Sequence, residues 1–288
     1  CIRDRPISTV NSSSRDVSMA EFMTPVFVSH GSPELAITQT AAHDFLKSYG
    51  RSVDRPKAIL TVSAHFETSG PVLVTDPSPE MIYDFGGFDP ALREIVYPAP
   101  GAPEVARLAF EALEASGLEP KLTEKRGYDH GVWVPLMLLY AEADIPVAQL
   151  SIDPDRDPAW HYRLGQALQP LTEQGVLVLG SGSLTHNLHE VFTPAGLRRR
   201  NDEVPQWVDD FAAWIAGRLA EGDVESLLNY RERAPFAVEN HPTDEHLLPL
   251  FVALGAAGEH ALGRRLHDSR EFGVLAMDAY AFDAEQAA

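Results

Sequence analysis

Residues 25–33 read PVFVSHGSP, a short apolar run that ends in a histidine followed by Gly, Ser and Pro. The β-branched and aromatic run before the histidine is typical of a strand that is covered on both faces. Gly31 and Pro33 supply turn chemistry that ends such a strand. The stretch therefore predicts a buried strand that delivers His30 to one edge of a sheet.

The same pattern returns twice along the chain. Residues 58–65, AILTVSAH, form a second apolar run that ends in His65, and residues 176–186, VLVLGSGSLTH, form a third that ends in His186. In open α/β sheets, ligands collect outside the carboxyl ends of the strands. We therefore expect His30, His65 and His186 to converge in space, and this convergence is the main functional signal of the sequence.

Strands and helices alternate over the rest of the chain. Strands are predicted at 71–75 and 146–152, and helices at 102–116, 158–175 and 205–219. This alternation indicates an α/β fold, a single domain with a central, largely parallel mixed sheet flanked by helices. The length of 288 residues and the hydrophobic content of 44% are sufficient for one large core.

The N-terminal residues 1–23 are polar and Ser-rich and have no apolar core of a signal peptide. We expect them to be a disordered leader, an upstream-translated segment or a cloning remnant, with Met19 or Met23 as the native start. Residues 24–288 would then form the functional domain.

Composition excludes several classes of protein. The formal net charge of -19 argues against a nucleic-acid partner, since binding of the phosphate backbone depends on clustered Lys and Arg. No apolar stretch approaches the roughly 20 residues of a membrane helix, so we expect a soluble, cytoplasmic protein without a membrane partner. Cys1 is the only cysteine, which excludes a disulfide framework and a thiolate metal site.

The remaining histidines of the eleven need individual interpretation. Five lie in helical or charged contexts and are expected to be surface or core residues: His43, His161, His189, His260 and His267. His130 lies in a turn between Asp129 and Gly131, which suits an acid behind the site, a substrate contact or a structural turn residue. In HPTDEH, the spacing of five places His241 and His246 on different helical faces, so they are not expected to bind one ion together.

Imidazoles without cysteine suit Zn, Fe, Cu or Ni, and a three-ligand face with open positions suits either hydrolytic Zn or oxygen-activating Fe(II). The sequence has no HExxH, no GxSxG, no glycine-rich phosphate loop and no DxDxDG loop. The common hydrolase and nucleotide-binding interpretations therefore lose weight.

Taken together, the motifs resemble the DOPA extradiol dioxygenase family, within the superfamily of class III extradiol ring-cleavage dioxygenases that also includes the β subunit of protocatechuate 4,5-dioxygenase. The matching segments are SHGSP at 29–33, SAHF at 63–66, YDFGGF at 83–88, YPAPG at 97–101, YDHGVW at 128–133, PVAQLSID at 146–153, GSGSLTHNL at 180–188 and NHPTDEHLLPL at 240–250. They follow the family's order and cover nearly all of the chain from about residue 24 onward. The ordered set is far more specific than any one of its members.

The resemblance implies a metal site and makes residues 24–288 an extradiol dioxygenase-like catalytic domain. The implied metal ligands are His30, His65 and His246. Fe(II) is the implied metal for activity, and imidazole ligands also accept Zn(II), which can occupy the site as isolated.

The resemblance also implies the roles of the residues around the metal. His186 would act as the acid and base over the open metal face, or as a fourth ligand when Zn(II) is bound, and His130 would bind substrate or relay protons. Tyr83, in an aromatic loop that is either a lid or a packed loop, and Ser183 are expected to contact the substrate. The implied partners are a catechol and O₂: His186 removes a proton from the catechol, and attack outside the diol opens the ring to a yellow product of the muconic semialdehyde type.

Several questions stay open at the level of the sequence. Relatives usually have proline in place of Asp244, which leaves the local loop and the substrate preference undecided. The catechol, cleavage at the 2,3 or the 4,5 bond, and a monomeric or dimeric state are also undecided. One alternative is a Zn-dependent hydrolase with Glu67 or Glu239 as base. Another is a non-enzymatic binding protein of the Memo type, although retention of all four motif histidines favours an enzyme.

Overall fold

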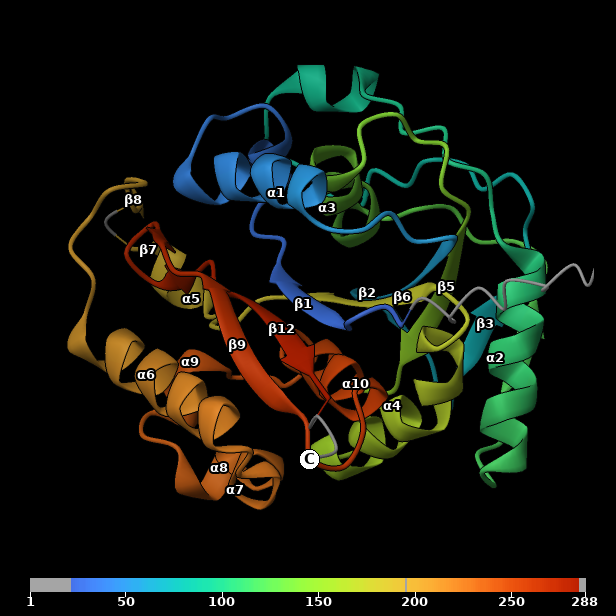
Figure 1. The fold of residues 1–288 in the computed structure, drawn as a ribbon. Coiled ribbons are helices and arrows are strands. Elements are labelled where there is room, and N and C mark those ends of the chain that lie inside the picture. Colours follow the sequence, from blue (N-terminus) through green and yellow to red (C-terminus); the bar gives the residue numbers. More distant parts are fainter. Residues whose placement is uncertain (1–21, 195, 285–288) are drawn as a thin grey trace, which may run out of the picture.

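An eight-stranded mixed sheet forms the centre of the molecule, with the strand order β4-β3-β5-β2-β6-β1-β12-β9 (Figure 1). The computed structural model describes residues 22–194 and 196–284. The strands of this sheet are β1 (Val26–Ser29), β2 (Ala58–Glu67), β3 (Val72–Val74), β4 (Lys121–Thr123), β5 (Val147–Ile152), β6 (Val176–Gly182), β9 (Leu262–His267) and β12 (Ala279–Asp283). Two short hairpins, β7 (Phe192–Thr193) with β8 (Gly196–Leu197) and β10 (Arg270–Glu271) with β11 (Leu275–Ala276), lie outside it.

The centre of the sheet is parallel and both of its sides include antiparallel pairs. β5, β2, β6 and β1 are parallel neighbours, whereas β12 runs antiparallel to β1 and to β9, and β3 runs antiparallel to β5. The register pairs Ser29 with Gly182 and Ser63 with Ser181, so the three histidine-bearing strands end at the same edge. The predicted α/β fold with a largely parallel mixed sheet is confirmed.

Helices cover both faces of the sheet (Figure 1). The α-helices are α1 (Ala41–Ser52), α2 (Pro103–Ala115), α3 (His130–Leu139), α4 (Pro158–Thr172), α5 (Leu188–Val191), α6 (Gln206–Glu221), α7 (Val224–Leu228), α8 (Tyr230–Arg233), α9 (Ala237–Asn240) and α10 (Leu248–Ala256), and two 3-10 turns are η1 (Pro33–Ala36) and η2 (Pro90–Glu94). α1 and α3 pack together on one face, and α4 and α10 pack together on the other. α6 lies against β9, at the end of the sheet.

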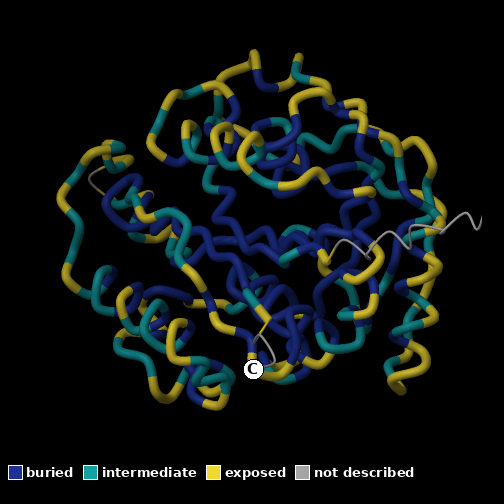
Figure 2. Tube along the Cα trace, in the orientation of Figure 1, coloured by how far each residue is buried: buried dark blue, intermediate teal, exposed yellow. Residues whose placement is uncertain are grey.

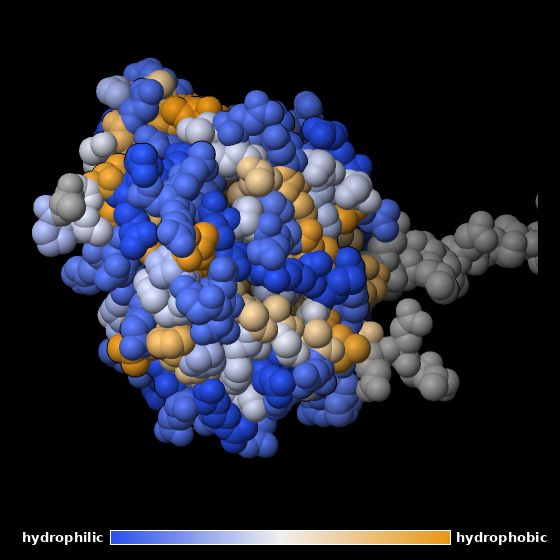
Figure 3. Space-filling view, turned by 90° about the vertical axis from the view of Figure 1, so that its left-hand side faces the viewer, coloured by the Kyte–Doolittle hydropathy of each residue, from blue (hydrophilic) through white to orange (hydrophobic). Residues whose placement is uncertain are grey.

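The central strands are buried along their whole length, as their continuous apolar runs predict (Figure 2). α10 is equally buried, in agreement with its sequence LPLFVALGA. The surface seen in Figure 3 is mainly hydrophilic with apolar patches. Within the described part of the chain, no helix combines the length and the apolar character that crossing a bilayer requires.

The sequence patterns missed the last two strands of the sheet. β9 reads LGRRLH and is largely exposed or half-buried because it is an edge strand, so it carries no apolar run. Almost all of the leader predicted for 1–23 falls outside the described residues. Met23 is buried, and its backbone N–H donates to the carbonyl of Thr172 at 2.9 Å.

His161, which the sequence assigns to the core or surface, is a buried neutral imidazole in α4. Its Nε2 accepts a hydrogen bond from the backbone N–H of Asp153 at 3.2 Å, and its Nδ1 lies 3.0 Å from the carbonyl oxygen of Asp157. Burial lowers the pKa of His161 to about 4. The unfolded chain therefore binds a proton below about pH 6.5 that the folded protein does not bind.

We predict that His161→Gln makes the free energy of unfolding less dependent on pH. In the wild type, the contribution of His161 falls as the pH drops from about 6.5 to about 4, by at most about 1.4 kcal/mol per pH unit. Urea unfolding at several pH values in this window measures the slope. The exposed His189 supplies the control, His189→Gln. Equal slopes for His161→Gln and the wild type would contradict the prediction.

Candidate functional site

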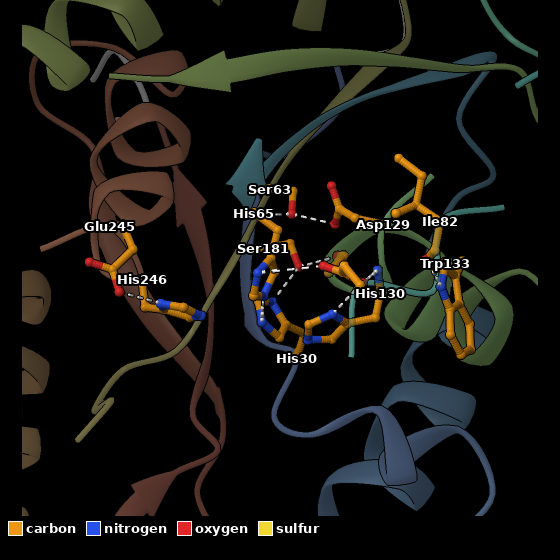
Figure 4. A network of polar contacts seen from close by, with 12 residues as sticks. His30, Ser63, His65, Ile82, Asp129, His130, Trp133, Ser181, Glu245 and His246 are labelled. Carbon is orange, nitrogen blue, oxygen red and sulfur yellow. Dashed lines mark hydrogen bonds and ion pairs between the residues drawn. The ribbon is translucent and has the colours of Figure 1, made fainter. Parts of the chain in front are cut away.

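Five histidines from five separate segments line one cavity of about 490 Å³. His30 directly follows β1, His65 lies near the end of β2, His130 is the first residue of α3, His186 follows β6 and His246 precedes α10. Four of them are drawn in Figure 4, where they surround a common point at the carboxyl edge of the sheet. The predicted convergence of His30, His65 and His186 is thus observed, and two further histidines join them.

His30 and His65 form the centre of the cluster. Their Nε2 atoms lie 3.1 Å apart, and their ring centroids are separated by 5.0 Å. The other nitrogen of His30, Nδ1, lies 3.0 Å from the hydroxyl of Ser181 (Figure 4). Two imidazole nitrogens at this separation can bind one ion from neighbouring coordination positions, since metal–nitrogen bonds measure about 2.0–2.1 Å.

Either His130 or His246 can complete a trio with this pair. The ligand atoms of His30, His65 and His130 lie within 4.8 Å of one another. The ring centroid of His246 lies 5.6 Å from that of His30 and 5.0 Å from that of His65. The ring centroid of His130 lies 5.3 Å from that of His30 and 4.1 Å from that of His65, so the trio with His130 is the more compact of the two. The donor set therefore fits a single metal ion.

For four of these histidines, burial favours the neutral imidazole that metal ligands require. Burial, together with the neighbouring imidazoles, lowers the pKa of His30 and His246 well below the usual value. For His65 burial lowers the pKa to about 4, and for His186 to about 3. His186 and His246 stack in parallel, with centroids 3.4 Å apart and an interplanar angle of 12°.

Two carboxylates that the sequence analysis missed orient these rings. Asp84 accepts a hydrogen bond from the backbone of His130 and contacts its Nδ1 at 2.9 Å, while Glu245 contacts Nδ1 of His246 at 2.9 Å. Burial acts to raise the pKa of Asp84, but hydrogen bonding and charge from His130 outweigh it, and the pKa falls to about 2. Glu245 also lies 3.9 Å from Nδ1 of His186. In the sequence, only the adjacency of Glu245 to His246 indicated that a carboxylate could contact one of these rings.

The carboxylates that were nominated for a hydrolase lie elsewhere. Glu67 and Glu239 are exposed, and neither is among the described residues that line the cavity. Burial, and then Glu245, raises the pKa of Glu67. The carboxylates beside the imidazoles are Asp84 and Glu245, and both are engaged with a histidine.

A buried network connects β2 to the start of α3. The carboxylate of Asp129, which is 1% exposed, accepts a hydrogen bond from Ser63 at 2.7 Å (Figure 4). It accepts a second one from Arg126 at 2.5 Å. Arg126 also donates to the carbonyl of His65 at 3.1 Å. These bonds fix the backbone that carries His65 and His130.

The small residues beside the histidines allow segments of the chain to approach each other closely. A Cβ on Gly182 would lie 2.0 Å from the carbonyl oxygen of His246, and one on Gly131 would lie 2.5 Å from Oγ of Ser63. These two glycines therefore leave room for neighbouring segments of the protein itself.

The two predicted substrate contacts lie in different places. Ser183 lines the cavity, and its hydroxyl donates to the carbonyl of Thr185 at 2.8 Å. Tyr83 donates its hydroxyl to the carbonyl of Ile95 at 2.7 Å and is not among the described lining residues, whereas the loop residues that follow it, 84–88, are. This loop therefore faces the cavity with Asp84 and Phe85.

The loop before α10 is held from outside the cavity. Asp244 accepts a hydrogen bond from the hydroxyl of Tyr230 at 2.6 Å and pairs with Arg231. The nearby His241 contacts the carbonyl of Leu184 through Nε2 at 2.8 Å and is fully buried. As predicted, His241 does not join His246 at the cluster.

Ligands of open α/β sheets bind at the carboxyl edge, where this cavity lies, and the imidazoles that line it suit a transition metal. The family model for the catalytic LigB subunit of aromatic ring-opening dioxygenase matches residues 23–281. The chain therefore belongs to this family, and it is an aromatic ring-opening extradiol dioxygenase. The family implies a catecholic substrate, O₂ and a non-haem metal.

Similar proteins support the same assignment. The chain is 42% identical to a 4,5-DOPA dioxygenase extradiol of Beta vulgaris, over 89% of this chain and 95% of the relative. It is 36% identical to one of Escherichia coli (strain K12), over 84% and 88%. The crystal structure of the uncharacterised protein JW3007 from Escherichia coli K12 matches with a TM-score of 0.74 and 31% identity, over 90% of this chain and 99% of that one. The predicted family is confirmed and is favoured over the hydrolase and the Memo-type protein.

Metal content after substitution distinguishes the two trios. We predict that His246→Ala lowers the metal bound per chain at least about tenfold, because a ligand is lost, and that His130→Ala retains most of the metal. Elemental analysis after reconstitution and gel filtration measures the ratio, with His189→Ala as control. The opposite result, loss of the metal in His130→Ala and retention of the metal in His246→Ala, would identify His30, His65 and His130 as the metal ligands.

Proposed function

We propose that this protein is a non-haem Fe(II)-dependent dioxygenase that inserts O₂ into a catechol and gives a product of the muconic semialdehyde type. The observation that carries the proposal is the stacking of a neutral imidazole, His186, against His246, within the same cavity as the His30 and His65 pair. Such an arrangement supplies both a metal face and a separate proton acceptor.

His30, His65 and His246 are the proposed metal ligands. Two observations support this trio: the lowered pKa of each ring and the contact of Glu245 with Nδ1 of His246. A carboxylate on the far nitrogen of a histidine fixes its orientation toward a metal. A bound Fe(II) would supply O₂ activation and polarisation of the catechol oxygens. Zn(II) fits the same ligands.

His186 is the proposed acid and base. Its imidazole lines the cavity beside that of His246, where it can accept a proton from a catechol hydroxyl. Glu245, 3.9 Å from Nδ1, offsets the positive charge that His186 would gain. His186 is also the proposed fourth ligand when Zn(II) is bound. Because its ring stacks on that of His246, with centroids 3.4 Å apart, it would have to turn toward the ion.

His130 is proposed to contact the substrate or to relay protons. The centroid of its ring lies 4.1 Å from that of His65, and the contact of its Nδ1 with Asp84 fixes the orientation of the ring. Ser183 lines the same cavity, and Tyr83 supports the loop whose next residues face it. Since several relatives are named for 4,5-DOPA, a single-ring catechol with a short side chain is the proposed substrate class.

Oxygen uptake tests the reaction directly. After anaerobic reconstitution with Fe(II), we expect O₂ consumption and a yellow product with at least one catechol of a small panel that includes DOPA. With Zn(II) in place of Fe(II), we expect no uptake, because Zn(II) is redox-inactive. Protein with one bound Fe(II) per chain and no uptake with any catechol would contradict the proposed function.

We predict that His186→Ala retains the metal and lowers kcat roughly 10²- to 10⁴-fold, the usual contribution of a general acid or base. Metal content and oxygen uptake are measured on the same sample. His189→Ala, an exposed histidine three residues further on, is the matched control and should turn over normally. Near-normal turnover of His186→Ala would refute its role in proton transfer.

A further inference from the structure

Apart from its histidines, the cavity is lined by negatively charged side chains and by no positively charged ones among the described residues. Apart from the histidines, Glu34 and Asp84 are the only charged side chains among the described residues that line it, and no Lys or Arg is among them. Asp84 is engaged with His130. Of these two carboxylates, Glu34 is therefore the one that does not contact a histidine of the cavity.

Two arginines lie over aromatic rings that line the cavity. Arg93, 5.7 Å from the ring centroid of Phe85, is exposed. Arg200 is paired with two carboxylates. Arg200 pairs with Glu34 at 3.0 Å and with the buried Glu271, so one guanidinium faces two carboxylates. Its charged group lies over the ring of Phe272, 4.7 Å from the centroid, and Phe272 itself lines the cavity. The three charged groups therefore sum to a net negative charge behind this part of the wall.

Phe272 is held in a strained conformation. Its φ of 52° lies in the left-handed region, which a bulky residue rarely adopts. The backbone N–H of Phe272 donates to the carbonyl of Arg200 at 2.8 Å, and the guanidinium of Arg200 covers its ring. Strain of this kind persists where the surroundings fix a side chain for function. Here it keeps an aromatic ring between the arginine and the cavity.

Apolar side chains form the remaining wall, on the side of α5, β7 and β8. They are Leu188, Val191, Phe192, Leu197, Phe272 and Leu275. Leu188, Phe192 and Leu197 are also large exposed hydrophobic residues. Figure 3 shows the face of the molecule on this side, where apolar patches interrupt the hydrophilic surface. This wall can accept an apolar substituent but offers no partner for an anion.

We propose that the cavity selects catechols with a neutral or cationic side chain over those with an anionic one, and that Glu34 sets this preference. The inference rests on the proposed function and adds the substrate class to it. A carboxylate on the substrate would be desolvated against an apolar wall and repelled by Glu34, whereas an ammonium group would be attracted. The formal net charge of -19 acts in the same direction at longer range.

A matched series of catechols tests the preference. Dopamine, DOPA, 3,4-dihydroxyphenylpropionic acid and 4-ethylcatechol carry the same ring with a cationic, zwitterionic, anionic and neutral side chain. With the Fe(II)-loaded wild type near neutral pH, we expect kcat/KM for dopamine to exceed that for the propionic acid by about tenfold or more, with DOPA between them. The ratio should shrink as the ionic strength rises from about 0.05 M to about 0.5 M.

Substitution then tests the residue. We expect Glu34→Gln to reduce the ratio of dopamine to propionic acid roughly five- to tenfold, with 4-ethylcatechol as the internal reference for each variant. Glu111→Gln changes the net charge equally on the exposed side of α2 and should leave the ratio unchanged. Metal content and the thermal midpoint check that Glu34→Gln is folded. If this variant does not fold, the salt dependence measured on the wild type still tests the charge preference.

The outcomes separate the inference from the proposed function. If none of the four catechols is cleaved by iron-loaded protein, the proposed function fails. If the wild type cleaves the propionic acid as well as or better than dopamine, the charge preference fails while the function stands. If the preference is present but Glu34→Gln leaves it intact, the role of Glu34 is wrong.

Discussion

The structure depends on holding five imidazoles together, in fixed orientations, at one edge of a sheet. Burying a polar ring is costly unless its nitrogens are hydrogen-bonded or bind a metal. Here the far nitrogen of three rings has a partner: Ser181 for His30, Asp84 for His130 and Glu245 for His246. The inner nitrogens are thereby directed toward the cavity. Burial disfavours protonation of the rings, and an unprotonated ring nitrogen is free to bind a metal cation.

This arrangement demands a rigid support. Three parallel strands end in register, so His30, His65 and the segment before His186 start from fixed positions. The bonds of Asp129 to Ser63 and Arg126 tie the strand of His65 to the start of α3. On the other side, Ser183 donates its backbone N–H to the carbonyl of His246 at 2.9 Å, which is feasible because Gly182 has no side chain. The metal centre is thus built on strand ends and helix starts and not on free loops.

The cavity has two chemically different sides. The imidazoles form a polar face where a diol can be oriented and deprotonated. The opposite wall is apolar, and the arginine behind it is neutralised by two carboxylates. The first side is suited to the reaction that the family carries out, and the second is where we propose that catechols are selected. Glu34 links the two sides, because it lies four residues after His30.

The sequence by itself determined the fold class, the convergence of the strand-end histidines and the family, because apolar runs and local motifs lie within single segments. It did not reveal β9, whose edge position removes the apolar pattern. It also missed Asp84 and Glu34, whose partners lie 46 and 166 residues away. Periodicity states which face of an element is buried, but it does not state which distant side chain that face meets. Only the tertiary structure decided these pairings, and with them the orientation of the rings and the charge of the cavity wall.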